Sequence, residues 1–526
     1  MTRLPRKPNS TLMHKLLYGL TILILFAECR QTKSWGSATE QWGVFELGLT
    51  GPKNGNPYTD VSLNVIFANG ETVVVVPGFY DGDGMYRVRF SPQHLGRWEY
   101  KTGSNAEQLN NKAGSFDCVP ATATNHGPVV VVNTFYLQYA DSTPFYSVGT
   151  TAYQWTSVKK EIQEQTVASL GDAPFNKIRM CVFPKSYRYG NDTEPWMYPF
   201  HRDADQNDFR QPNYEFFQNF DHRIQQLLDL GIQADVILFH PYDKWGYRSM
   251  GKEMNAHYVR YMIARLSAFR NVWWSLANEW DVPEIKESIA WEEIGNLLQR
   301  EDPHHRLRGI HNWYGSQDHF FDHTRPWITH VSTQTSQFYN ALTWRNEYQK
   351  PLLFDEMRYE GDVPSGWGSL TAQEMVSYFW MAGLSGGYAT HGETFVNPAD
   401  DSTEVRWWAK GGVLVGQSVE RIQFFRDILQ QAPVTAMTPT LLAAGDSTQL
   451  NSNVYLFAKA GEFYLAYKAD NNFSIALNLP AGGLYKAEVI DTWNMTITPL
   501  DDLYSGNTRI VLPGSPYLAL RLTKQE

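Results

Sequence analysis

The stretch Asn271-Val-Trp-Trp-Ser-Leu-Ala-Asn-Glu-Trp-Asp281 decides how this sequence is expected to fold. It opens with a largely apolar run, Val272 to Ala277, which has the length of a buried parallel strand. The run ends abruptly in Asn278 and Glu279. In a β/α barrel, polar side chains at the carboxyl end of a strand belong to the active-site face. Burying a lone carboxylate is costly, so Glu279 is expected to line a polar cleft or to have a raised pKa.

A second stretch, Lys350-Pro-Leu-Leu-Phe-Asp-Glu-Met-Arg358, repeats this pattern. A short apolar strand again runs into a carboxylate, here Glu356. Two carboxylates at the ends of two buried strands are the minimum apparatus for cleaving a glycosidic bond. The alternative is that each glutamate is a surface-loop residue or half of an ion pair. For the two together, in this strand context, the catalytic interpretation is favoured.

The bulk properties exclude several classes of protein. A chain of 526 residues is too long for one ordinary core, so two or three domains are expected. The net charge of −10, without a long basic run, argues against a nucleic-acid partner. Cys29, Cys118 and Cys181 show no metal-ligand spacing, and no HxH follows an early strand, so neither a metal nor a cofactor is expected. Cys118 and Cys181 are expected to be reduced and buried.

The N-terminus has the pattern of a secretory signal, residues 1–28. Basic residues precede the apolar run Leu16 to Ala27, which is too short to span a bilayer. The minority alternative is an uncleaved membrane anchor. Lipidation of Cys29 is a further possibility, although Glu28 fits a lipoprotein cleavage box poorly. The mature chain is therefore expected to be exported to the periplasm, the outer surface or the medium.

Two all-β regions flank a region of alternating strands and helices. Residues 39–120 contain short alternating or β-branched runs, and Asp81-Gly-Asp-Gly84 is a turn signal between two of them. Residues 433–526 show the same character, and a structural cap is the default role for them. Between them, residues 129–432 alternate strands with helices, the sign of a parallel α/β architecture.

Eight strands can be counted in the central region, which suits a (β/α)8 barrel, also called a TIM barrel. They are predicted at Phe145–Gly149, Asn176–Phe183, Gln233–Phe239, Val272–Ala277, Leu307–Ile310, Ile328–Thr333, Pro351–Phe354 and Gly386–Ala389. A doubly wound sheet is the alternative. That fold predicts a glycine-rich phosphate turn after an early strand, and the sequence contains none.

These motifs resemble a known clan of enzymes. Ser275-Leu-Ala-Asn278-Glu279 resembles the strand-four signature of clan A glycoside hydrolases, and Phe354-Asp355-Glu356 resembles their strand-seven nucleophile. The whole chain looks like bacterial members with one small β-sandwich in front of the barrel and another behind it. The resemblance implies a retaining mechanism with Glu279 as acid/base and Glu356 as nucleophile. It also implies that Asn278 binds the sugar 2-hydroxyl and that Arg179 hydrogen-bonds the nucleophile.

Other polar and aromatic side chains are expected to share the barrel mouth, because each follows a predicted strand. His240 could bind a sugar hydroxyl or be a satisfied histidine behind the site, and His311 is expected to orient Glu279 or substrate. Glu393 is the main rival for a catalytic role. The remaining candidates for binding substrate are Trp155, Trp313, His391 and Trp407. Of the adjacent pair Trp407 and Trp408, one is expected to belong to the core.

One departure from the clan pattern concerns the region after strand six. Many members place a tyrosine there that bonds the nucleophile, but this sequence reads Ser332-Thr-Gln-Thr-Ser-Gln337. The candidates to replace this tyrosine are Gln334 and, reaching in from nearby segments, Tyr359 or Tyr339. The chain therefore resembles a divergent branch, and its sugar is not readable from the sequence. A plant or algal polysaccharide is the expected substrate, and a carbohydrate-binding protein on an inactive barrel is the rival interpretation.

Overall fold

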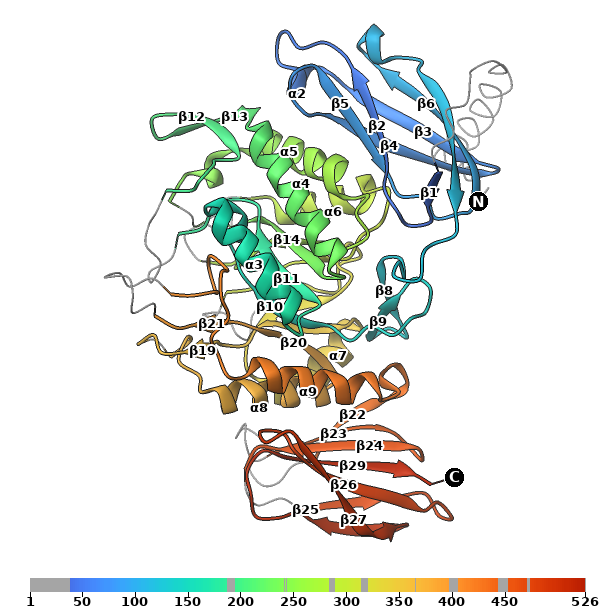
Figure 1. Ribbon diagram of the computed structural model, residues 1–526, viewed down its shortest axis with the longest axis vertical. Coiled ribbons are helices and arrows are strands. Elements are labelled where there is room, and N and C mark those ends of the chain that lie inside the picture. Colours follow the sequence, from blue (N-terminus) through green and yellow to red (C-terminus); the bar gives the residue numbers. More distant parts are fainter. Residues whose placement is uncertain are drawn as a thin grey trace, which may run out of the picture.

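The computed structural model describes residues 38–186, 194–240, 242, 244–282, 289–313, 320–364, 366–396, 405–442, 453–470 and 474–525. The expected signal segment, residues 1–28, and Cys29 lie outside these residues. Three parts are stacked along the long axis of the molecule: an N-terminal β domain, a central barrel and a C-terminal β domain (Figure 1). No helix in the described part of the chain is long and apolar enough to cross a membrane.

The central domain is a parallel, nearly closed barrel of eight strands, as predicted. Their order is β16-β15-β14-β11-β10-β20-β18-β17, and an isolated parallel bridge between His311 and Ser332 joins the two ends of this order. The strands are β10 (Val148–Thr151), β11 (Lys177–Cys181), β14 (Gln233–Phe239), β15 (Val272–Ala277), β16 (Arg308–Gly309), β17 (Val331–Gln334), β18 (Leu352–Glu356) and β20 (Gly387–His391). Every residue of these strands is buried, which explains their continuous apolar runs.

Helices cover the outside of the barrel and alternate with its strands (Figure 1). They are α3 (Lys160–Asp172), α4 (Tyr214–Asp229), α5 (Lys252–Leu266), α6 (Trp291–Glu301), α7 (Ala341–Tyr348), α8 (Ala372–Leu384) and α9 (Val419–Gln430). Helix α8 begins with a capping box in which Thr371 and Glu374 satisfy each other's backbone N–H groups. Two small two-stranded sheets sit beside the barrel: β12 (Phe200–Asp203) pairs antiparallel with β13 (Gln206–Pro212), and β19 (Glu360–Gly361) pairs parallel with β21 (Glu393–Thr394).

The N-terminal domain is a seven-stranded arrangement in the order β1-β7-β6-β3-β4-β5-β2. Its strands are β1 (Ala38–Glu40), β2 (Phe45–Thr50), β3 (Leu63–Asn69), β4 (Thr72–Tyr80), β5 (Met85–Phe90), β6 (Gly96–Ser104) and β7 (Ala113–Val119), with the short helix α2 (Pro57–Asp60) between β2 and β3. Pairing is antiparallel except between β1 and β7. Asp81-Gly-Asp-Gly84 forms the expected hairpin turn, with Met85 N–H donating to the Gly82 carbonyl at 2.8 Å. A hairpin of β8 (Val129–Val132) and β9 (Tyr136–Tyr139) then leads into the barrel.

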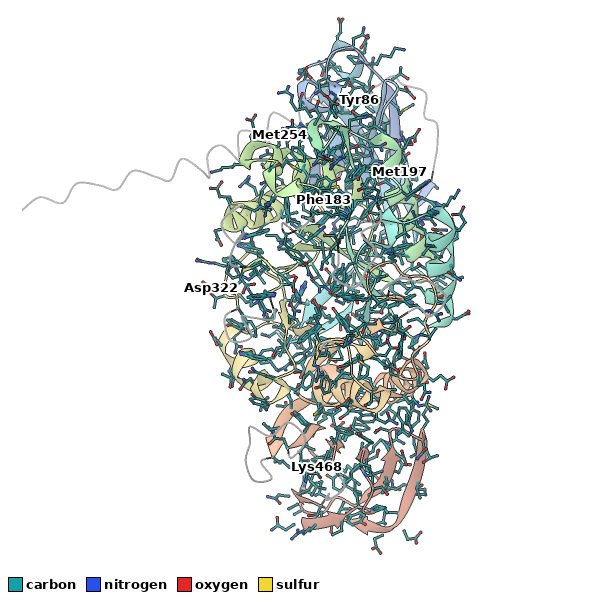
Figure 2. All side chains as sticks on the ribbon, turned by 90° about the vertical axis from the view of Figure 1, so that its left-hand side faces the viewer. Tyr86, Phe183, Met197, Met254, Asp322 and Lys468 are labelled. Carbon is teal, nitrogen blue, oxygen red and sulfur yellow. The ribbon has the colours of Figure 1, made fainter. Side chains whose placement is uncertain are left out.

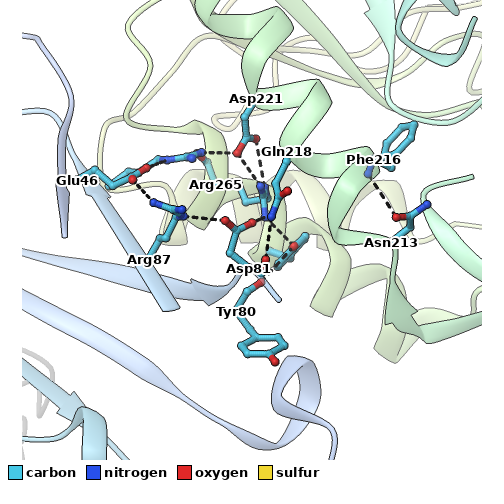
Figure 3. A network of polar contacts seen from close by, with 11 residues as sticks. Glu46, Tyr80, Asp81, Arg87, Asn213, Phe216, Gln218, Asp221 and Arg265 are labelled. Carbon is cyan, nitrogen blue, oxygen red and sulfur yellow. Dashed lines mark hydrogen bonds and ion pairs between the residues drawn. The ribbon is translucent and has the colours of Figure 1, made fainter. Parts of the chain in front are cut away.

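A buried ion network joins this domain to the barrel (Figure 3). Arg265 of α5 donates to Asp81 at 2.8 Å and to Asp221 of α4 at 2.6 Å. Arg89 of β5 also reaches Asp221, at 2.7 Å, and Arg87 reaches Asp81, also at 2.7 Å. Each carboxylate thus has two guanidinium partners, which offsets the cost of burying these charges. The network fixes the N-terminal domain against helices α4 and α5 on the outside of the barrel.

The C-terminal domain is also built of antiparallel strands. A six-stranded sheet has the order β22-β23-β24-β29-β26-β27, and β25 pairs with β28. The strands are β22 (Thr438–Leu442), β23 (Val454–Lys459), β24 (Phe463–Lys468), β25 (Ser474–Asn478), β26 (Tyr485–Asp491), β27 (Thr496–Tyr504), β28 (Asn507–Val511) and β29 (Leu518–Lys524). Tyr467 ties it to α8: its ring stacks on Trp380, with centroids 5.6 Å apart, and its hydroxyl donates to Ser377 at 2.8 Å. Cys118 and Cys181 are both free and buried.

Candidate active site

The carboxyl ends of the barrel strands face one side of the molecule. They point to the left in Figure 1, where β19 and β21 follow β18 and β20, and Figure 2 shows that side face on, with Phe183 and Met197 in its upper part. Glu279 follows β15 directly, and Glu356 is the last residue of β18. Both predicted carboxylates therefore lie at this edge of the barrel.

Glu356 is 4% exposed and is held by two tyrosines. Tyr153 lies just after β10, and its hydroxyl donates to Glu356 Oε2 at 2.9 Å. Tyr359 also hydrogen-bonds Glu356, and the two tyrosine oxygens lie 3.3 Å apart. Arg179 of β11 donates through Nη1 to the Tyr153 oxygen at 3.3 Å, and His311 Nε2 is 3.8 Å from Glu356 Oε2. Arg179 is thus linked by hydrogen bonds to the nucleophile candidate through Tyr153.

The electrostatics of Glu356 reflect a balance between burial and nearby charges. Burial raises the pKa of Glu356, and the Glu279 carboxylate raises it further. Lys185, the Tyr359 hydroxyl and Arg179 act in the opposite direction, but the pKa remains above its ordinary value. The influence of Glu279 on Glu356 means that the two carboxylates share one electrostatic environment. The catalytic roles of the two carboxylates stay a prediction.

Glu279 has an unusual backbone conformation, with a positive φ of 54°. A non-glycine residue in the left-handed region is strained, and such strain persists where the surrounding structure fixes it. On one side the Asn278 N–H donates to the Phe239 carbonyl at 3.0 Å, and on the other the Trp280 N–H donates to the His311 carbonyl at 3.0 Å. These bonds tie the turn to both neighbouring strands.

Tyr242 is the counterpart of Tyr153 on the Glu279 side. It hydrogen-bonds Glu279, and its hydroxyl accepts from Asn278 Nδ2 at 2.8 Å. Asn278 is fully buried, and its Oδ1 has no partner among the described residues. Each catalytic candidate therefore has a tyrosine that contacts its carboxyl group.

Beneath Glu356 lies a buried ion network centred on Asp355. Lys177 donates to Asp355 at 2.5 Å and to Asp235 of β14 at 3.1 Å, and Ser332 donates to Asp355 at 2.5 Å. Arg179 Nε lies 3.5 Å from Asp235. Burial alone would raise the pKa of Asp355, but Lys177 and Arg179 bring it below its ordinary value. Asp355 is thus a fixed anion that anchors the end of β18.

Two of the three histidines expected at the site, His240 and His311, are buried and neutral. Burial, with Lys185 nearby, lowers the pKa of His240 to about 3, and its Nε2 donates to the Pro184 carbonyl at 2.9 Å. Burial and the charge of Arg179 bring the pKa of His311 well below its ordinary value. His311 therefore contacts Glu356 as a neutral ring rather than as a cation.

Trp313 lies after strand five, and Gln334 is the last residue of strand six. The half-buried Trp313 donates its backbone N–H to Asp281 at 2.6 Å. The Gln334 N–H donates to Asn312 Oδ1 at 2.9 Å, while the buried Gln334 Oε1 has no partner in the described part of the chain. Of the three residues weighed as a replacement for the strand-six tyrosine, Tyr359 is the one whose hydroxyl hydrogen-bonds the Glu356 carboxylate, while Gln334 is paired with Glu356 in the strand ladder.

Two tryptophans expected to stack on sugars belong to the hydrophobic core instead. Trp155 and Trp407 are fully buried members of the main core cluster, so neither has a face open to a ligand. Trp407 donates its Nε1 to Thr150 at 2.9 Å. Its neighbour Trp408 is half-buried, and its ring centroid lies 5.7 Å from that of Tyr359. Trp408, rather than Trp407, is therefore the member of the pair at the site.

His391 and Glu393 form a separate group with Glu360. One ligating atom from each lies within 4.8 Å of the others, so the trio has the donor types of a cation site. However, the two carboxylates already accept hydrogen bonds from the four consecutive N–H groups of residues 415–418. Burial and the neighbouring Glu360 raise the pKa of Glu393 to about 7. The arrangement works as an anchor for the loop that leads into α9.

A family model for the catalytic domain of apiosidase-like proteins matches residues 132–436. That match covers more than half of the chain and contains all of the barrel strands. The chain belongs to the apiosidase-like family. Two models of domains of unknown function match on either side, DUF5060 at residues 38–105 and DUF5605 at residues 453–523.

Solved structures place this apiosidase-like chain among glycoside hydrolase folds. It is 37% identical to a Bacteroides vulgatus protein whose crystal structure is described as that of a candidate glycoside hydrolase, with a TM-score of 0.83 over 93% of this chain and 100% of that chain. A family 5 glycoside hydrolase from the same species is 15% identical, with a TM-score of 0.60 over 77% of this chain and 95% of that chain, and shows the fold alone. No curated protein matches the sequence. The resemblance to clan A is thereby confirmed.

Three residues of the apiosidase-like site escaped sequence reasoning: Tyr153, Tyr242 and Lys185. Tyr153 and Tyr242 each follow a predicted strand, as the other candidates do, but their side chains are amphipathic and read equally well as core residues. Lys185 lies four residues after β11. The position of each after a strand was the available signal, and only the fold shows which of them reach the carboxylates.

Proposed function

We propose that this protein is an exported, retaining glycoside hydrolase. The observation that carries the proposal is the pairing of Glu279 and Glu356 at the ends of β15 and β18, where the charge of one raises the pKa of the other. Two carboxylates are the apparatus that glycosidic cleavage requires. The basic and apolar N-terminal leader supports export. The family name makes apiosides one class of candidate substrate beside oligosaccharides of plant or algal cell walls.

In this mechanism Glu356 attacks the anomeric carbon while Glu279, in its protonated form, donates its proton to the leaving oxygen. The bond to the leaving group breaks, and a glycosyl ester forms on Glu356. Glu279 then takes a proton from water, which attacks the same carbon and releases Glu356 as a carboxylate. Tyr153 and Tyr359 hold Glu356 in position, and Tyr242 holds Glu279. The buried neighbours exclude water from the nucleophile until the leaving group has departed.

The test begins with a screen of aryl glycosides, apiosides and cell-wall oligosaccharides on the purified protein. Glu279→Gln and Glu356→Ala should each lower kcat by several orders of magnitude while far-UV circular dichroism and the thermal midpoint show a folded protein. Proton NMR of the first product should show retained anomeric configuration. An inverted product would rule out double displacement.

The rival carboxylate supplies a discriminating control. Glu393 is buried with its oxygens occupied by backbone N–H groups, so Glu393→Gln should keep most of the turnover that Glu356→Ala loses. If both variants lost the same turnover, the second catalytic role could not be assigned to Glu356 rather than to Glu393. Binding of sugars by isothermal titration without turnover of any substrate would favour a carbohydrate-binding protein on an inactive barrel.

A further inference from the structure

Lys185 lies between the two halves of the candidate active site. Its ammonium nitrogen is 4.3 Å from the centroid of the Tyr153 ring and 5.1 Å from that of the Tyr242 ring. Its backbone N–H donates to Gln154 Oε1 at 3.2 Å, and the residue is 5% exposed. The first ring carries the hydroxyl that bonds Glu356, and the second carries the one that bonds Glu279. A single cation therefore touches the partners of both carboxylates.

The charge balance around the nucleophile gives this position its importance. Two neighbouring carboxylates shielded from water repel each other, and nearby cations make it easier for both to ionise. Lys177 is committed to Asp355 and Asp235, and Arg179 also lies beside Asp235. Lys185 and Arg179 both lower the pKa of Glu356, and Lys185 has the larger effect.

Contacts with the aromatic faces fix where the ammonium group can be. A cation over the face of a tyrosine ring is attracted by the ring's quadrupole, and the attraction grows when water is excluded. Held between two rings, the lysine side chain loses the freedom that it has on a surface. The two tyrosines in turn are held in place by the cation that they share. The position of Lys185 thus couples the orientation of one hydroxyl to that of the other.

From this geometry we infer that Lys185 is a positioning residue of the active site, which aligns Tyr153 and Tyr242 and supplies the positive charge that faces Glu356. The inference rests on the proposed function in that Glu356 is the nucleophile. Neither the sequence motifs nor the resemblance to clan A assigns Lys185 a role. In the clan pattern this task belongs to the strand-two arginine, which here contacts Tyr153 instead.

The experiment is a carbon-13 NMR titration of the full-length protein labelled at the glutamate side-chain carboxyl carbon. The Glu356 signal is assigned by its loss in Glu356→Gln. The other titratable or charged groups facing Glu356 are Glu279, Arg179, Tyr153, Tyr359 and His311. All of them stay in place in the variants Lys185→Met and Lys185→Arg. Lys468→Met, a change at an equally buried lysine in the C-terminal domain (labelled in Figure 2), is the matched control.

In Lys185→Met the titration midpoint of Glu356 should move up by about one pH unit, the lower end of what a nearby opposite charge produces. In Lys185→Arg, which keeps the positive charge, the Glu356 midpoint should lie close to that of the parent protein, and Lys468→Met should leave the midpoint unchanged. A Glu356 midpoint in Lys185→Met equal to that of the parent protein would overturn the inference.

Activity separates this outcome from a failure of the proposed function. With an active aryl glycoside, the acidic limb of kcat/KM should move with the NMR midpoint in Lys185→Met. If Glu356→Ala keeps full activity, the nucleophile assignment fails whatever Lys185 does. If Glu356→Ala is inactive and Lys185→Met keeps the parent midpoint, the proposed function stands and the inference about Lys185 falls.

Discussion

Replacing Tyr153 by phenylalanine removes one hydroxyl and almost no volume. That hydroxyl donates to Glu356 Oε2 at 2.9 Å and accepts from Arg179 at 3.3 Å, so the variant loses both the bond and the link to the guanidinium. A hydrogen bond to a charged group is worth about 1.5–3 kcal/mol. Tyr359 still bonds Glu356, so we expect the lower end of that range.

The sign follows from which form of Glu356 the hydroxyl stabilises. A donated hydrogen bond favours the carboxylate, so its loss should raise a pKa that burial and Glu279 have already raised. About 1.4 kcal/mol corresponds to one pH unit, or tenfold. We therefore expect the acidic limb of kcat/KM to move up by about one unit. The loss should be about tenfold below this limb and should shrink as the pH rises above it.

The assay is the pH profile of kcat/KM on the aryl glycoside found in the screen. Tyr146→Phe is a matched control, because Tyr146 is also a buried tyrosine, and its hydroxyl donates to the Gly387 carbonyl at 3.0 Å rather than to Glu356. Its pH profile should match that of the parent protein. If folded Tyr153→Phe also kept the parent acidic limb, the hydrogen bond would not tune the nucleophile, and the reasoning would be refuted.

Two further predictions concern stability. Burial raises the pKa of Glu393 from 4.5 to about 7, so between these pH values the folded protein holds a proton that the unfolded chain has released. The free energy of unfolding should therefore fall by up to about 3 kcal/mol as the pH rises from 4.5 to 7. In urea titrations Glu393→Gln should flatten this dependence of the free energy on pH, and a dependence equal to that of the parent protein would contradict the prediction. Arg265→Met should lower the free energy of unfolding by about 3–5 kcal/mol, because it removes one of the two guanidinium partners from each of the buried carboxylates Asp81 and Asp221. Arg260→Met, on the same helix but in an exposed pair with Glu301, should cost less than about 1 kcal/mol, and similar losses in the two variants would show that burial does not set the cost.

The barrel could be predicted because its strands are buried on both faces. Strands β14 and β15 appear at the predicted residues, Gln233–Phe239 and Val272–Ala277, since a fully buried parallel strand leaves an uninterrupted apolar run. Strand β27 is an opposite case, because the sequence does not mark it as a strand. Its residues Thr496–Tyr504 are mostly exposed and include a proline and two aspartates, so no alternation marks it. It is defined by pairing with β26, which is a property of the fold rather than of the segment.

The site could be predicted only as far as its carboxylates. A glutamate at the end of an apolar strand is conspicuous in the sequence, but the hydroxyl that serves it comes from a residue 203 positions away. The tryptophans show the same limit. Trp407 and Trp408 are adjacent and chemically identical, and the positive φ of Trp407, 67°, accompanies a turn that puts one ring in the core and leaves the other near Tyr359. Such a backbone angle leaves no mark in the composition of the segment.

The missing strand-six tyrosine has a structural explanation. In this chain, strand six is occupied with other tasks: Ser332 of β17 donates to Asp355 and forms the bridge to His311 that joins the two ends of the barrel sheet. The hydroxyls on Glu356 come instead from Tyr153, after β10, and from Tyr359, after β18. Parallel strands bring all their carboxyl ends to one edge, so any of them can deliver a hydroxyl to the same carboxylate. The requirement is therefore for a donor at that point in space, and its place in the sequence is free to change.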